Sequence, residues 1–100
     1  MPETTNISAG GPLFPLGRTV AKPGALDALV LADVMPQALL DRHVCGDWGE
    51  LDEDDCQANG QALSMGARLL SAYALPDGVR VRVITEADHS ATTLLLPEEY

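Results

Sequence analysis

The chain is poor in basic and in aromatic residues. It carries 6 Lys and Arg against 15 Asp and Glu in 100 residues, for a formal net charge of −9 at pH 7. Phosphate-binding surfaces need clustered Lys and Arg, so direct binding of DNA or RNA is disfavoured. With only 4 aromatic residues, stacking platforms for single-stranded nucleic acid are scarce as well. A basic protein surface is the favoured partner, because opposite potentials steer encounter.

Cysteines and long apolar runs are equally scarce. Cys45 and Cys56 are a single pair, too few for a disulfide framework, and reduced thiols are expected. No apolar run approaches the roughly 18 residues that span a bilayer. The N-terminus lacks the basic and apolar regions of a secretion signal. These absences predict a soluble cytoplasmic protein.

The hydrophobic fraction and the length predict one small globular domain. At 46% hydrophobic residues the composition is not that of a disordered chain, and 100 residues leave room for one core. Residues 1–12 have no hydrophobic period and are expected to form a flexible leader. Residues 13–100 are expected to form a single domain.

Helical signals dominate the middle of the chain. A short edge strand is expected within residues 16–21, between turn-forming Pro and Gly residues. Apolar residues then recur at helical spacing from residue 25 to a point before Met35, which precedes a proline. Pro36 suits the first turn of a second helix, which ends at Gly46. Residues 51–66 predict a third helix with Asp52 as its N-cap and Asp55 in its first turn.

Strand signals dominate the C-terminal third. Val79, Val81 and Val83 alternate with more polar neighbours, the period of a sheet with one buried face. LPDG (residues 75–78) and EADHS (residues 86–90) mark two turns, and a last strand is expected to end before Pro97. Helices followed by such a meander predict an α+β fold with two or three short helices packed on one face of a three- to four-stranded antiparallel sheet.

The strongest local feature is an acidic run, GDWGELDEDD, in residues 46–55. It holds six carboxylates without a Lys or Arg among them: Asp47, Glu50, Asp52, Glu53, Asp54 and Asp55. One interpretation is a helix start, since carboxylates complement the positive end of the helix dipole. Another is a partner-binding surface, because neighbouring like charges repel unless a cationic partner meets them. A Ca²⁺ loop is disfavoured, because the alternating ligands and central Gly of an EF-hand are missing.

Other chemistry-bearing residues favour structural interpretations. The residues with ligand chemistry are His43, Cys45, Cys56 and His89; they could in principle close a zinc site, but their spacing matches no zinc finger. Packing is favoured for Cys56, which lies on an apolar helix face, and nothing local activates a thiol nucleophile. The consecutive residues 88–90 (Asp, His, Ser) cannot reproduce the geometry of a catalytic triad. We therefore expect no catalytic residue, cofactor or metal.

Two further features are left open between structure and recognition. Trp48 is either an anchor in a core short of aromatic residues, the favoured interpretation, or an exposed recognition side chain. Arg80 and Arg82 lie on the wetter face of the predicted hairpin. Cross-strand ion pairing is their default role, and partner contact is the alternative.

Several motifs together carry a family resemblance. GDWGELDEDD, RLLSAY, LPDG, VITEADHS and TTLLLPEEY resemble a family of small proteins carried on bacterial plasmids and other mobile elements, over residues 13–100. The chain is also similar to type I-F anti-CRISPR proteins, phage-encoded inhibitors of about this size and acidity. The second resemblance implies a non-enzymatic protein that binds the CRISPR surveillance complex and occupies basic surfaces that would otherwise grip target DNA.

The acidic run and the resemblance predict one mechanism. A surveillance complex recognises duplex DNA with Lys and Arg, and the six carboxylates are expected to face such cations and exclude DNA. The alternative is a plasmid-encoded regulator that binds a restriction protein or another DNA-handling protein. Both interpretations predict a protein partner, with no direct contact to nucleic acid or membrane.

Overall fold

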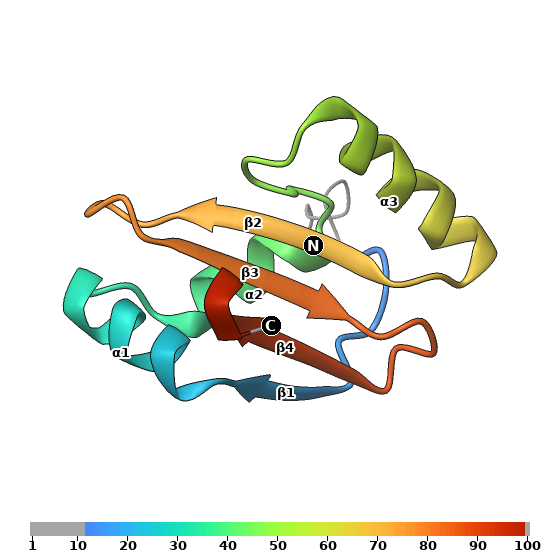
Figure 1. Ribbon diagram of the computed structural model, residues 1–100. Coiled ribbons are helices and arrows are strands. Elements are labelled where there is room, and N and C mark those ends of the chain that lie inside the picture. The colour runs from blue at the N-terminus through green and yellow to red at the C-terminus, as the bar shows by residue number, and fades with distance from the viewer. Residues whose placement is uncertain (1–11, 100) are drawn as a thin grey trace, which may run out of the picture.

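The computed structural model describes residues 12–99, which form helices around one four-stranded sheet (Figure 1). The strands are β1 (Arg18–Ala21), β2 (Leu69–Ala74), β3 (Arg80–Thr85) and β4 (Ala91–Leu95). The helices are α1 (Pro23–Ala32), α2 (Pro36–Val44), α3 (Glu53–Met65) and the short 3-10 helix η2 (Pro97–Glu99). Apart from Pro12, the expected leader lies outside the described residues.

The sheet has the order β1-β4-β3-β2. β3 is antiparallel to both β2 and β4, as the two predicted turns require. β1 instead runs parallel to β4, with Arg18 opposite Ala91 and Ala21 opposite Leu94. The α+β class is confirmed, but the sheet is mixed where a purely antiparallel one was expected. A strand of four residues reveals neither its partner nor its direction, and the long connection between β1 and β4 allows parallel pairing.

Local sequence signals set several element boundaries, as predicted. Pro36 occupies the first turn of α2, where its missing N–H costs nothing. Gly66 ends α3 in the left-handed conformation, with a φ of 73°. Gly78 has a φ of 89° in the turn between β2 and β3. These three boundaries confirm the predicted second helix, third helix and hairpin.

α1 and α2 cover one face of the sheet. Leu29 of α1 and Leu40 of α2 are buried together with Val83 and Leu94 of the central strands, in the larger of two hydrophobic clusters. The two helices are bent by 105° relative to each other, and α2 lies behind the strands in Figure 1. Within residues 12–99 no single helix is long and apolar enough to cross a membrane; only this bent pair meets the length and composition criteria, and only when taken together.

α3 lies beside the sheet edge formed by β2, above the strands in Figure 1. The side-chain amide of Asn59, which is buried, donates to the Leu70 carbonyl (2.6 Å) and accepts from the Leu70 N–H (3.0 Å). Asn59 therefore satisfies backbone groups that an edge strand leaves unpaired. Two or three helices were expected on one face of the sheet; α1 and α2 lie there, and α3 contacts the edge at β2.

Glu99, in η2, caps the start of α1. Its carboxylate accepts hydrogen bonds from the N–H groups of Gly24 (2.7 Å) and Ala25 (3.0 Å), and also from Leu96 (2.9 Å). Lys22, at the N-cap position of α1, makes no side-chain cap. The bond from the Leu96 N–H is the largest cause of a lowered pKa of Glu99, and those from Gly24 and Ala25 act in the same direction. A distant carboxylate thus replaces the local cap.

Candidate interaction surface

The acidic run is divided between two structural settings. Asp47 and Glu50 lie in the loop before α3, and each is paired with a base from another element. The Arg42 Nε at the end of α2 lies 2.7 Å from Asp47, and Arg80 of β3 lies 3.3 Å from Glu50. Residues 46–55 themselves contain no Lys or Arg, but in the folded chain bases from α2 and β3 pair with two of the six carboxylates.

The other four carboxylates lie at the start of α3. Asp52 is the N-cap, and its side chain accepts from the Asp55 N–H at 2.8 Å, which confirms the predicted cap. Glu53, Asp54 and Asp55 occupy the first turn, are exposed, and form no ion pair with a base in residues 12–99. The helix dipole stabilises these carboxylates, but three are more than one cap requires. They are the free negative charges of the run.

The loop that carries Asp47 and Glu50 also closes the sheet edge. The Glu50 N–H donates to the Ala72 carbonyl (2.6 Å), and the Ala72 N–H donates to the Trp48 carbonyl (3.1 Å). Gly49, between them, has a φ of 74°, and a Cβ there would lie 2.1 Å from the Ala72 oxygen. Only glycine fits this position. Part of the acidic run is therefore built into the fold.

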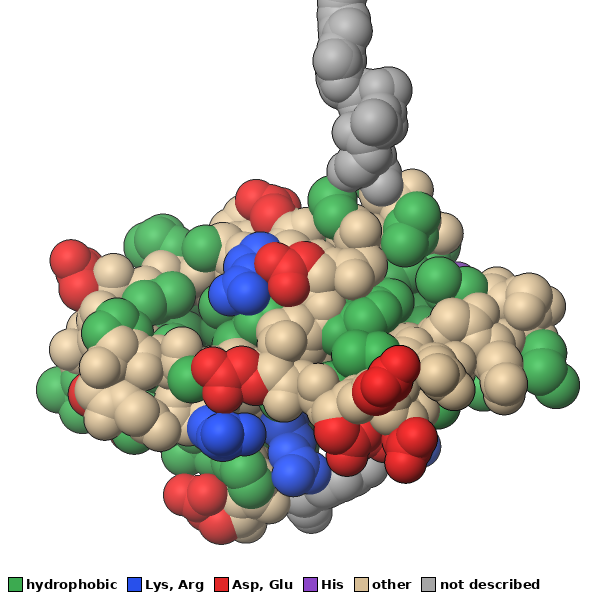
Figure 2. Space-filling model, turned by 90° about the horizontal axis from the view of Figure 1, so that it is seen from above, with side chains coloured by type: hydrophobic (Ala, Val, Ile, Leu, Met, Phe, Trp, Pro, Cys, Tyr) green, Lys and Arg blue, Asp and Glu red, His purple; other side chains and the backbone are tan. Residues whose placement is uncertain are grey.

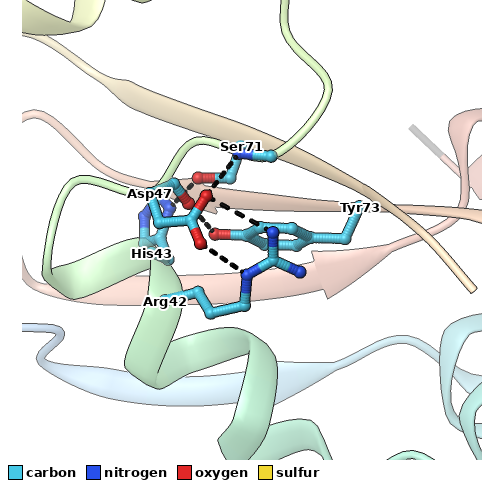
Figure 3. A network of polar contacts seen from close by, with 6 residues as sticks. Arg42, His43, Asp47, Ser71 and Tyr73 are labelled. Carbon is cyan, nitrogen blue, oxygen red and sulfur yellow. Dashed lines mark hydrogen bonds and ion pairs between the residues drawn. The ribbon is translucent and has the colours of Figure 1, made fainter.

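A cluster around Arg42 fixes the start of this loop (Figure 3). The Arg42 guanidinium lies 4.5 Å from the centre of the Tyr73 ring, in addition to its pair with Asp47. The Tyr73 hydroxyl donates to the Asp47 carbonyl at 2.6 Å. The Arg42 hydrogen bond holds the pKa of Asp47 below its usual value, and burial raises the pKa of Tyr73 to about 12. Both groups keep their ordinary charge at neutral pH.

The surface around the acidic run has mixed charge. Figure 2 shows acidic side chains in several separate groups over the face seen from above, with Lys and Arg side chains between them. A hollow of about 320 Å³ is lined by Glu50, Asp52 and Asp55 together with Arg80 and Arg82. Arg80 therefore ion-pairs as expected, but with a loop residue instead of a cross-strand neighbour.

A buried hydrogen-bond chain runs through the fold beside this loop. The Thr92 hydroxyl donates to the Leu16 carbonyl (2.8 Å), which can only accept. Thr85 must then donate to Thr92 (2.7 Å), and His43 Nε2 must donate to Thr85 (2.9 Å). His43 Nδ1 is left as the acceptor for the Ser71 hydroxyl (2.5 Å). The neutral form of His43 is therefore the Nε2–H tautomer.

This hydrogen-bond chain has the residue types of a catalytic proton relay, but a substrate has no access to it. His43, Ser71, Thr85 and Thr92 are all 0% exposed, so no substrate atom can reach them in this conformation. Burial lowers the pKa of His43 to about 4, since a charged imidazole would lose its hydration without gaining a counter-ion. The arrangement holds a neutral histidine inside the protein.

The remaining candidates are dispersed. No three His, Cys, Asp or Glu residues within residues 12–99 are grouped to hold a metal ion. Cys45 is exposed, Cys56 is half-buried, and no disulfide joins them. Trp48 is half-buried and stacks on Phe14 with ring centres 6.3 Å apart, as expected of an anchor. The sequence pattern predicts that Asn59 lies on one face of the third helix with Cys56 and Leu63, but not that it contacts β2. The cap that Glu99 forms on α1 was not predicted.

Comparison with known proteins adds no identification. No protein-family model, no curated protein and no solved structure gives a significant match to this chain.

Proposed function

We propose that this chain is a non-enzymatic inhibitor that binds a type I-F CRISPR surveillance complex in the bacterial cytoplasm and blocks its access to target DNA. The main support for this proposal is the group of exposed carboxylates in the first turn of α3. These are Glu53, Asp54 and Asp55, and within residues 12–99 no base is paired with them. With Asp52 they form a surface that we call the α3 acidic surface. Its complement is a Lys- and Arg-rich protein surface.

The ion pairs of Asp47 and Glu50 restrict the proposed binding surface to the start of α3. Asp47 and Glu50 are engaged with Arg42 and Arg80, so they contribute less free charge than the sequence suggests. A single exposed ion pair contributes only about 0–1 kcal/mol of interaction free energy. Close pairs of opposite charge that lose their water inside an interface can contribute several kcal/mol. The α3 acidic surface must therefore act as a group.

The test uses the purified protein and a type I-F surveillance complex. We expect co-elution in size-exclusion chromatography and loss of the gel shift of target duplex DNA. If the protein elutes alone and DNA still binds, the anti-CRISPR proposal fails. The search then moves to restriction proteins and other DNA-handling proteins.

Two matched variants locate the binding surface. E53Q/D54N/D55N neutralises three carboxylates and keeps the Asp52 cap, whereas D77N/D88N/E98Q makes the same change in net charge elsewhere on the surface. We expect the first variant to weaken binding by about tenfold or more and to reduce its salt dependence, and the second to bind nearly as the parent does. Equal effects of the two variants would show that only total charge matters.

A further inference from the structure

Three strongly exposed apolar side chains lie on α1 and at the start of α2. Val30, Leu31 and Met35 are 76%, 83% and 72% exposed. Beside them a groove of about 320 Å³ separates the two helices, with Leu26 and Val34 also in its lining. Large apolar side chains that gather around a groove mark interaction sites, whereas single exposed ones need no explanation. We call this region the α1–α2 groove.

The fold explains why these residues are exposed. α1 buries Ala25, Ala28 and Leu29 against the sheet. Val30 and Leu31, on another side of this helix, are left exposed. The bend of 105° between α1 and α2 opens the groove and keeps the second helix from covering it.

The segment that lines the groove is acidic. Residues 26–36 contain two acidic residues, Asp27 and Asp33, and no Lys or Arg. Asp33, the left-handed residue that ends α1, lies in the groove lining itself. A second copy of this chain would bring the same carboxylates, and another net charge of −9, against them. An apolar segment flanked by Lys or Arg would complement both the groove and its border.

We propose that the α1–α2 groove binds a partner-protein segment whose apolar side chains enter the groove and whose flanking Lys or Arg side chains meet Asp27 and Asp33. Such a site would combine apolar anchors with a charged rim, as interfaces generally do. It is separate from the α3 acidic surface, because α1 and α3 lie at opposite ends of the molecule in Figure 1. The proposal does not depend on the surveillance complex.

The test is an NMR titration of the full chain, labelled with ¹⁵N, with two short synthetic amphipathic helical peptides. One peptide is built from Leu and Lys and the other from Leu and Glu. We expect the Leu–Lys peptide to shift the amide signals of Leu26, Val30, Val34 and Met35, and the Leu–Glu peptide to leave them unchanged. Shifts confined to residues 52–55, or equal shifts with both peptides, would overturn the proposal.

Paired variants and light scattering complete the test. V30Q/M35Q should weaken binding of the Leu–Lys peptide by about tenfold or more, while L13Q/M65Q, which changes exposed apolar residues elsewhere, should leave it nearly unchanged. Light scattering of the chain alone should give a monomer. A dimer that V30Q/M35Q dissociates would identify a second copy as the occupant and refute the proposal. Because no surveillance complex is used, failure here is distinct from failure of the proposed function.

Discussion

The buried His43 should make the stability of the fold depend strongly on pH. Its pKa is about 4 in the folded chain, against 6.5 for an ordinary histidine. As the pH falls below 6.5, the unfolded chain binds a proton at this residue before the folded chain does. The stability that His43 contributes is therefore complete above pH 6.5 and is lost as the pH falls from 6.5 to about 4.

The size of this effect follows from the difference in pKa. About 2.5 pH units at 1.36 kcal/mol each correspond to about 3 kcal/mol. The free energy of unfolding of a small domain is roughly 5–15 kcal/mol, so the loss is a large share of the total. In the middle of the range the slope should approach about 1.4 kcal/mol per pH unit.

Urea unfolding of the parent and of H43Q between pH 7.5 and 4 measures the effect. Gln can still donate to Thr85 but has no titrating ring, so H43Q should be less stable at pH 7.5 and should lose about 3 kcal/mol less on acidification. Carboxylates titrate in both proteins and cancel in the difference. NMR of the His43 ring gives a second reading, which should remain the neutral Nε2–H form well below pH 6. Parallel curves for the two proteins, or a ring that titrates near pH 6.5, would refute the reasoning.

Two further predictions concern positions that the backbone fixes. G49A should lower the free energy of unfolding by about 2–4 kcal/mol, because φ is positive there and an added Cβ would meet the Ala72 oxygen. G60A should raise the free energy of unfolding by about 0.5–1 kcal/mol, because nothing lies within 4 Å of an added Cβ. Urea unfolding measures both variants, and equal effects would contradict the prediction. E99Q should lower the melting temperature at pH 7, and E98Q should not. Since the pKa of Glu99 is lowered, the difference in melting temperature between E99Q and the parent should shrink as the pH falls through 4.5. A difference that grows would contradict this.

Local signals predicted the elements well, and the distant contacts poorly. Pro36, Gly66 and the Asp52 cap act within one turn of the chain, so their spacing was enough to place the helix ends. The pairing of Glu50 with Arg80 joins residues that only the folded sheet brings together. The direction of β1 is likewise set by its partner strand. Alternation along a strand indicates a buried face, not which strand lies beside it.

In the candidate site, too, local features were predicted and distant contacts were not. The sequence predicted the α3 acidic surface as a helix start with surplus charge, and the exposed Glu53 and Asp54 agree with that prediction. It did not predict that Asp47 would be paired with Arg42. It also gave no reason to single out the α1–α2 groove, because Val30 and Leu29 are chemically alike in sequence, yet one is exposed and the other buried.

The cap that Glu99 places on α1 has a consequence for synthesis of the chain. The N-terminal elements β1 and α1 depend on partners near the opposite end of the sequence, β4 and Glu99. Gly24 and its capping carboxylate are 75 positions apart in the sequence. Domains form as units during translation, and contacts this distant in sequence slow folding. On the ribosome, the first strand and the first helix must wait until residues 91–99 have been made, and the hairpin of β2 and β3 can form before them.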